Sequence, residues 1–117
     1  MLFSGAVESV SGKRITLSTP SGKVEATARE VEVEVGAEAH AAVRPEKVRF
    51  GSEGDNVSTV WIRQIVYLGV STQYIAELPD GENLVFYQQN SREDANPEIG
   101  EEVSVAWDAR NCLILGG

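Results

Sequence analysis

Apolar and polar residues alternate with a period of two along much of the chain, and this pattern limits the possible folds more than any other feature. The clearest run is 31–35, where three valines alternate with two glutamates, and similar runs lie at 15–18, 24–29 and 103–107. Successive side chains of a strand point to opposite faces, so each run predicts a strand that buries one face. No run has the spacing of a long amphipathic helix. The sequence therefore predicts an all-β protein.

Polar turn sequences separate these runs and indicate how many strands there are. Gly, Pro, Asn or Asp occur at Ser11–Lys13, Pro20–Gly22, Pro79–Glu82 and Asn96–Pro97, and these residue types favour tight turns. The spacing predicts about ten short strands in a small barrel or sandwich.

One of the expected strands is long and bent. The run 60–68 loses its alternation near Gln64, which indicates a bulge or a strand that bends between two sheets. Gly69 follows and would supply either a positive φ or a close approach of the backbone. A long bent strand followed by a hairpin is typical of small Greek-key barrels of the OB type. We therefore expect an OB-fold-like barrel or sandwich.

The two parts of the chain resemble each other. Residues 36–50 and 100–114 each run from a glycine and an acidic residue through a strand and a polar turn into a second strand. This pattern suggests two similar halves, about 1–51 and 56–117, that bury one face against each other. The alternative is that small β-proteins commonly show this pattern without any duplication.

The charge and composition narrow the classes of partner. Ten Lys and Arg oppose 18 Asp and Glu, which gives a formal net charge of −8. Nucleic-acid binding requires cations that displace counterions from phosphates, so the excess of acid argues against it. No apolar stretch is long enough to enter a membrane, and the first residues lack the features of a signal peptide. Partners are expected to be proteins or small molecules.

The sequence contains no recognisable catalytic motif. The Gly-Lys pairs at 12–13 and 22–23 lack the earlier glycine and following Ser or Thr of a phosphate-binding loop. There is no Gly-x-Ser-x-Gly segment for a serine nucleophile. A single cysteine excludes an internal disulfide and a thiolate zinc site, and it fits a reducing compartment. We therefore predict no catalytic, cofactor-binding or metal-binding residues.

The remaining reactive or charged residue types have ordinary structural explanations. His40 is expected at a sheet surface, and Cys112 is expected to be buried in an apolar strand. The first acidic cluster would be the solvated face of a strand. The second would be a polar loop, with attraction of a cation or a polyamine as the alternative. These clusters are Glu30, Glu32 and Glu34, and Glu93, Asp94, Glu98, Glu101 and Glu102.

The segment Arg44-Pro45-Glu46 is the most informative one. Proline fixes φ and removes a backbone donor, so the strand must end here and Arg44 is expected to be extended. Two interpretations stay open. The first is a connecting turn with a local ion pair between Arg44 and Glu46. The second is a contact loop whose guanidinium group recognises a carboxylate on another domain or subunit.

Several segments occur in an order that resembles a known family. They are Leu2–Val7 with its Gly-x-Val, Val43–Val48 with its Arg-Pro-Glu, Asn56 before Ile-Val-Tyr-Leu-Gly at 65–69, the Pro-Asp-Gly hairpin at 79–81 and the strand at 103–107. Together they resemble the transport-associated OB (TOBE) domain, the C-terminal accessory domain of ABC-importer ATPases. The resemblance covers nearly the whole chain and is greatest for the spermidine/putrescine and ferric-iron importer branch.

This resemblance implies a function. TOBE domains follow the ATP-hydrolysing domain, help to hold two ATPase subunits together and are candidates for receiving regulatory signals. We therefore expect residues 1–117 to be a single accessory domain, a fragment without its upstream ATPase domain and without enzyme activity of its own. ATP and Mg would belong to the missing domain.

The expected partners are the chain's own ATPase domain, a second copy of the subunit and, indirectly, the membrane permease subunits. The expected location is cytoplasmic, at the inner face of the cell membrane. Arg44, Pro45 and Glu46 would then dock the domain onto its own ATPase domain or the second subunit. Trp61, Tyr67 and Gly69 are further interface candidates, with packing in the core as the other interpretation of Trp61 and Tyr67.

Two other functions stay open. Related β-modules bind oxyanions such as molybdate, but Ser71 and Thr72 are a thin supply of hydroxyl donors for such a ligand. A polyamine would suit the acidic surface better. An OB-type oligonucleotide binder would need stacking aromatic residues in a basic groove, and aromatic residues make up 7% of the chain with no basic flank.

Overall fold

The computed structural model describes residues 2–89 and 96–115. This part of the chain contains ten strands and two short 3-10 helices, and the predictions of an all-β protein with about ten strands are confirmed. In chain order the elements are β1 (Leu2–Ser11), β2 (Arg14–Thr19), β3 (Gly22–Thr27), β4 (Glu38–Val43), η1 (Pro45–Lys47), β5 (Arg49–Phe50), β6 (Asn56–Tyr67), β7 (Ser71–Glu77), β8 (Asn83–Gln89), β9 (Glu102–Trp107), η2 (Ala109–Asn111) and β10 (Cys112–Ile114).

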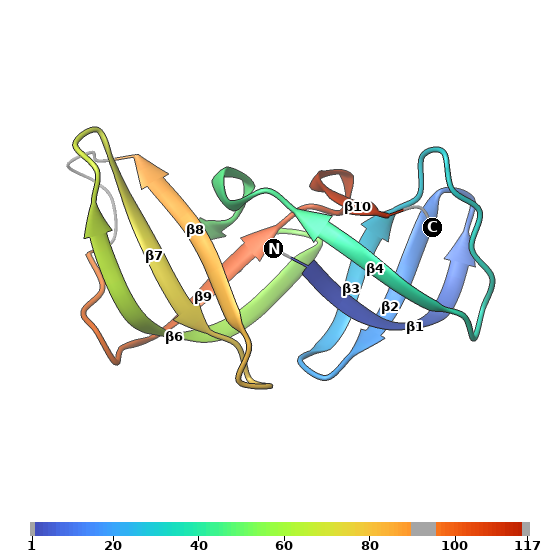
Figure 1. Ribbon diagram of the computed structural model, residues 1–117, viewed down its shortest axis with the longest axis horizontal. Helices are drawn as coiled ribbons and strands as arrows, with labels where there is room; N and C mark the ends of the chain where they lie inside the picture. The colour runs from blue at the N-terminus through green and yellow to red at the C-terminus, as the bar shows by residue number, and fades with distance from the viewer. Residues whose placement is uncertain (1, 90–95, 116–117) are drawn as a thin grey trace.

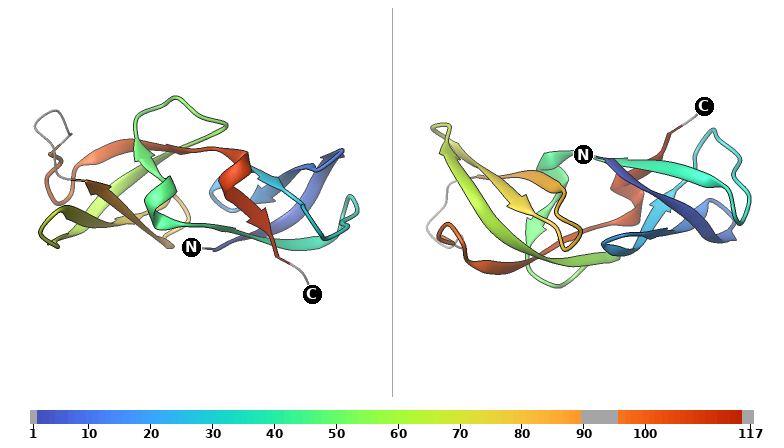
Figure 2. Two further views of the ribbon diagram at one scale, coloured as in Figure 1. Left: turned by 90° about the horizontal axis from the view of Figure 1, so that it is seen from above. Right: turned by 60° about the horizontal axis from the view of Figure 1, so that its bottom comes forward.

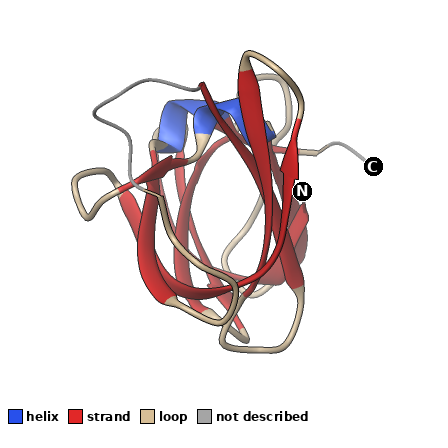
Figure 3. Cartoon of the chain, turned by 90° about the vertical axis from the view of Figure 1, so that its left-hand side faces the viewer, coloured by secondary structure: helices blue, strands red, loops and turns tan. Residues whose placement is uncertain are grey.

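The strands form two units that lie side by side along the long axis of the molecule (Figure 1). The first is a closed barrel with the strand order β1-β2-β3-β10-β4, and the second is a five-stranded sheet with the order β5-β9-β6-β7-β8. Seen along the long axis, the strands are strongly curved around a common centre (Figure 3). The molecule is elongated, with extents of 43 × 24 × 24 Å.

Each unit contains one strand from the other part of the chain. After β4 the chain passes through η1 into β5, which pairs with β9 of the second sheet. After β9 it passes through η2 into β10, which pairs with β4 and β3 of the barrel. Both crossings have the order strand, 3-10 helix, strand, and they lie next to each other between the two units (Figures 1 and 2). Neither unit can separate from the other without losing a strand.

The core runs through both units because the alternating residues point inward from every main strand. Ile15 and Leu17 of β2 are fully buried in the barrel, as the period of two predicts. At the junction the Phe3 ring of β1 stacks on the Trp107 ring of β9, with centroids 5.1 Å apart and an angle of 9° between the planes. Burial of such large rings contributes strongly to stability. The aromatic stack therefore joins the first and second units.

The predicted strand at 31–35 is wrong. These residues have no ladder partner, although Val31 and Val33 still pack partly buried against the core and Glu32 and Glu34 are exposed. The segment is held at its end, where the Gly36 N–H donates to the carbonyl of Val7. The alternation reflects an extended chain that lies across the barrel with one apolar side. An apolar side alone does not specify a hydrogen-bonded neighbour.

β6 has an irregular register between Ile62 and Gln64, which confirms the predicted bulge.

Two glycines are required by the backbone at their positions. Gly69 has a φ of +88° with open space around it, so it supplies a positive φ rather than a close approach. At Gly5 the reason is contact, because a β-carbon there would overlap the carbonyl oxygen of Ser18 on β2. The Gly-x-Val start of the chain thus reflects tight packing of β1 in the barrel wall.

The two predicted hairpin turns meet between the units. The turn at Pro20–Ser21 joins β2 to β3, and the turn at 78–82 joins β7 to β8. The Asp80 N–H donates to the Ser21 hydroxyl over 3.2 Å. Turns that are 59 residues apart in the sequence are therefore direct neighbours in space.

Candidate interaction surfaces

The described residues contain no group of three His, Cys, Asp or Glu side chains that could hold a metal ion. Within the same residues no helix has the length and apolar character needed to cross a membrane. His40 lies exposed on β4, as predicted, and its Nδ1 is 2.7 Å from the Ser4 hydroxyl on β1. In the second acidic cluster Glu98, Glu101 and Glu102 are exposed, and the other two members, Glu93 and Asp94, lie outside the described residues.

Cys112 is fully buried on β10, which confirms its predicted place in the core. Burial raises the pKa of the thiol to about 11, and the nearby Trp107 indole acts in the opposite direction. Because the thiolate is the nucleophile, a buried thiol with such a pKa is unreactive at neutral pH. Cys112 is a packing residue.

A network of polar contacts fixes the junction at the end of β9. The Asp55 carboxylate accepts a hydrogen bond from the Ala109 N–H over 2.9 Å, and the Thr27 hydroxyl donates to the Ala109 carbonyl over 2.9 Å. Asn56, which the sequence marks only as part of a motif, bonds to the backbone of Glu25. These contacts hold η2 against the barrel. They position the crossing segment.

The loop Arg44-Pro45-Glu46 is where sequence reasoning expects it, at the end of β4. Arg44 is extended, with φ −78° and ψ 137°, and Pro45 begins η1. Both Arg44 and Glu46 are exposed. Among the described ion pairs none joins these two side chains, so the predicted local ion pair does not form. The connecting turn is therefore present without its ion pair, and contact of Arg44 with another domain or subunit stays a prediction.

Arg44 lies on the rim of a depression of about 530 Å³ that has four cations around it. We call this depression the basic groove, and its cations are Arg29, Arg44, Lys47 and Arg110. None of the carboxylates that the structure describes lies within 4.0 Å of these four groups. Sequence reasoning selected only Arg44. Lys47 lies in the same segment, Val43–Val48, whereas Arg29 and Arg110 are isolated cations far from it in the chain.

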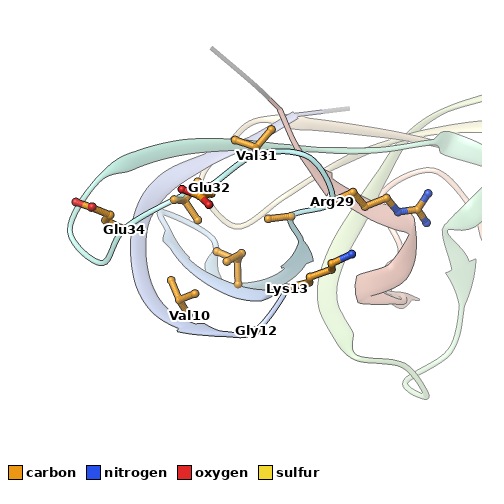
Figure 4. A pocket seen from close by; sticks show the side chains of 10 residues that line it. Val10, Gly12, Lys13, Arg29, Val31, Glu32 and Glu34 are labelled. Carbon is orange, nitrogen blue, oxygen red and sulfur yellow. The ribbon is translucent and has the colours of Figure 1, made fainter.

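A second depression, of about 590 Å³, lies at the end of the barrel that the 31–34 segment crosses, and it has a different character. Its lining includes Lys13 and the glutamates Glu32 and Glu34 (Figure 4). The Arg29 side chain points away from both glutamates (Figure 4). This depression is thus lined by both acidic and basic residues, and Arg29 is shared between it and the basic groove.

The turn between β6 and β7 exposes three large apolar side chains. Tyr67 is 78% exposed, Leu68 50% and Val70 83%, and we call these three residues the apolar hairpin tip. The alternative that Tyr67 packs in the core is wrong. Trp61 is half-buried on the same strand and pairs with Glu77 and Glu102. The hairpin tip lies at the far end of the second sheet from the barrel (Figure 1).

Comparison with known families identifies the domain. The model of the TOBE domain family matches residues 41–115. The chain belongs to the TOBE domain family. Residues 2–40 lie outside that match but are part of the same pair of interlocked units.

This TOBE domain is similar in sequence to two proteins that carry the same name. It is 52% identical to the spermidine/putrescine import ATP-binding protein PotA of Rubrobacter xylanophilus, over 99% of this chain and 31% of that protein. It is 36% identical to the PotA protein of Thermobifida fusca, over 64% of this chain and 21% of that protein. The chain thus spans less than a third of the length of either relative.

A solved structure has the same fold as this TOBE domain. It is the cytoplasmic molybdate-binding protein ModG with molybdate bound, with a TM-score of 0.84 over 97% of this chain and 94% of that chain. The sequence identity is 17%, so the likeness concerns the fold alone. It confirms the prediction of an OB-fold-like architecture.

Proposed function

We propose that this TOBE domain is a non-catalytic accessory domain of an ABC-importer ATPase subunit that takes part in polyamine uptake. It stabilises the dimer of ATPase subunits and is a point at which regulatory signals act. The relatives named for spermidine and putrescine import support this proposal, because one of them matches nearly the whole chain at 52% identity. ATP and Mg would be held by the ATP-binding portion of the parent subunit.

The observation that carries the proposal is the apolar hairpin tip. Tyr67 and Val70 are each more than three-quarters exposed although both side chains are large and apolar. Neighbouring apolar side chains that remain in water on a folded protein commonly mark a surface that a partner covers. Gly69 gives the turn its positive φ and so holds the three side chains on one tight loop.

The proposed partners are the ATP-binding portion of the same subunit, a second copy of that subunit and, through them, the membrane permease. The domain would then lie in the cytoplasm at the inner face of the membrane. Its net charge of −8 suits such a protein-bound location better than direct contact with anionic lipid headgroups.

The test uses the complete parent subunit and the double variant Tyr67→Ser/Val70→Ser. Both side chains are exposed, so the unfolding free energy should change by less than about 0.5 kcal/mol. The ATP-dependent dimer, measured by light scattering, should weaken at least about tenfold because apolar interface area is lost. The matched control is Val57→Ser, an apolar residue 48% exposed on β6 outside the tip. An unchanged dimer with both variants would contradict the proposal.

A module that binds small ligands is the second candidate, and the fold shared with ModG is the observation that favours it. Calorimetry of this chain with putrescine, spermidine, molybdate and sulfate tests this function. Heats no larger than those of dilution for all four compounds would remove it.

A further inference from the structure

The cations that the structure describes differ in whether a carboxylate lies close to them. Arg14, Lys23, Arg49 and Arg63 each have a carboxylate oxygen within 3.4 Å. Of the other cations that the structure describes, Lys13 has no ion pair, and the remaining four are those of the basic groove. In a chain with an excess of eight acidic groups, four of the five described cations without an ion pair thus line one groove. Such a cluster repels itself, so it contributes little to stability and suits an anionic partner.

The fold brings these cations together at the two crossings between the units. Arg29 lies shortly after β3, Arg44 directly follows β4, and Lys47 lies in η1. Arg110 lies in η2, which adjoins the same side of the barrel. The backbone at both crossings is anchored, on one side by the β4–β10 pairing and on the other by the contacts of Ala109. The groove is therefore a surface with a fixed shape, not four independent side chains.

Much of the remaining lining of the groove is apolar. It includes Val43, Pro45, Leu113 and Leu115, and Leu115 is 45% exposed. Apolar area together with arginine is characteristic of protein interfaces. A small oxyanion site uses hydroxyl groups and backbone amides, and neither Ser nor Thr lines this groove. A single-stranded nucleic acid would use stacking aromatic residues, and none lines it either.

We propose that the basic groove binds a carboxylate-rich segment of the ATP-binding portion of the parent subunit. This proposal rests on the proposed function and names the contact that the Arg-Pro-Glu loop makes. The arginines at 29, 44 and 110 would receive carboxylates in forked geometry, and an aliphatic side chain of the segment would cover Leu113 and Leu115. The surrounding acidic surface would repel the same segment, so the groove also sets its position.

The first experiment measures peptide binding to this chain. The probe is the peptide Asp-Glu-Leu-Glu-Asp-Leu, its control is the Asn/Gln counterpart, and amide NMR shifts report the site. The acidic peptide should shift residues around Arg44 and Arg110, and its affinity should fall as salt rises from about 50 to about 200 mM. The counterpart should not bind. Equal binding of both peptides, or shifts outside the groove, would overturn the proposal.

A charge-reversed pair of variants sharpens this experiment. Arg44→Glu/Arg110→Glu should weaken acidic-peptide binding at least about tenfold. Lys13→Glu/Arg63→Glu changes the net charge by the same amount outside the groove and should weaken it less than about threefold. Equal losses of peptide affinity in the two double variants would mean that only the net charge of the chain matters, and would overturn the proposal. Tripolyphosphate or a short single-stranded DNA that displaces the peptide at lower concentration would assign the groove to a phosphate ligand instead.

The second experiment identifies the partner in the complete subunit. A photo-cross-linking phenylalanine at position 115 lies in the groove lining, and one at position 57 is the matched exposed control. The proposal expects a cross-link from position 115 to an acidic segment of the ATP-binding portion, with a yield that Arg44→Glu/Arg110→Glu lowers. A cross-link only to another TOBE domain or a permease subunit would overturn it. If hairpin-tip variants weaken the dimer while these groove results fail, the proposed function stands without this contact.

Discussion

The side chain of Asn56 pairs with the backbone of Glu25 in the way that a neighbouring strand would. The Asn56 Nδ2 donates to the Glu25 carbonyl over 2.8 Å, and the Glu25 N–H donates to the Asn56 Oδ1 over 2.6 Å. Asn56 begins β6 and Glu25 lies in the middle of β3, so one amide joins the second sheet to the barrel. β10 pairs with β3 only at Thr27. The Asn56 side-chain amide therefore takes the place of a strand partner for the backbone N–H and C=O of Glu25.

Replacing Asn56 by Ala should destabilise the fold by about 2–4 kcal/mol. Asn56 is 3% exposed, and the change leaves a backbone donor and a backbone acceptor of Glu25 without partners. Urea unfolding followed by tryptophan fluorescence measures the loss. Asn83→Ala, at an exposed position on β8, is the control and should cost less than about 0.5 kcal/mol. Similar losses of unfolding free energy at both positions would contradict the role of the Asn56 amide in joining the second sheet to the barrel.

Gly5→Ala should be among the most damaging single substitutions in the chain. The added methyl group would overlap the Ser18 carbonyl on the neighbouring strand, which is backbone and cannot rotate away. We expect a loss of more than about 3 kcal/mol or a failure to fold, seen by circular dichroism and thermal unfolding. Gly12→Ala is the comparison, because Gly12 has a φ of +60° but open space around it. It should cost only about 1–2 kcal/mol.

The Cys112 thiol should make the fold less stable in alkaline solution. Burial raises its pKa from 9.0 to about 11, so the unfolded chain loses the thiol proton first. The thiol contribution is therefore complete below about pH 9 and is lost as the pH rises towards about 11, with a slope of up to about 1.4 kcal/mol per pH unit. Urea unfolding at several pH values measures the slope. Cys112→Val removes this group and should show a smaller slope, and identical slopes would refute the assignment.

Asp108 should behave in the opposite sense, because its pKa lies below the ordinary value of 3.8. The main cause is a hydrogen bond from Arg49, whose guanidinium nitrogen is 3.3 Å from the Asp108 Oδ1. A lowered pKa means that the carboxylate contributes stability above its ordinary pKa and loses it as the pH falls through the folded value. Arg49→Gln should move the Asp108 midpoint upward in a carboxyl-carbon NMR titration. Arg63→Gln, which removes a different ion pair, should leave that midpoint unchanged.

Much of the secondary structure follows from local chemistry. Alternation places Ile15 and Leu17 in the core, and glycine or proline at the turns separates the strands, because both effects act between near neighbours in the chain. The bulge in β6 was predicted for the same reason. The alternation at 31–35 led to a wrong strand, since a pattern of side chains shows which side is buried but not which backbone lies alongside.

The residues of the two candidate interaction surfaces are less easily predicted from the sequence. Arg44 could be selected from the sequence because proline at 45 forces a strand end, and the exposed hairpin tip lies in a segment that the family resemblance marked. The interpretation that Tyr67 packs in the core was wrong because the sequence shows that an aromatic residue is present but not whether the fold buries or exposes its side chain. Arg29 and Arg110 carry no local signal, and Lys47 was included only as a member of the segment Val43–Val48.

By itself the sequence determined an all-β chain with its turns, its buried faces, its excess of acid and its TOBE family motifs, because each of these depends on residue type and short spacing. Only the tertiary structure decided that β5 and β10 exchange between the two units, that Asn56 completes the edge of β3, and that cations from three separate segments line one partly apolar groove. These features depend on contacts between residues up to about eighty positions apart, which local propensity cannot specify.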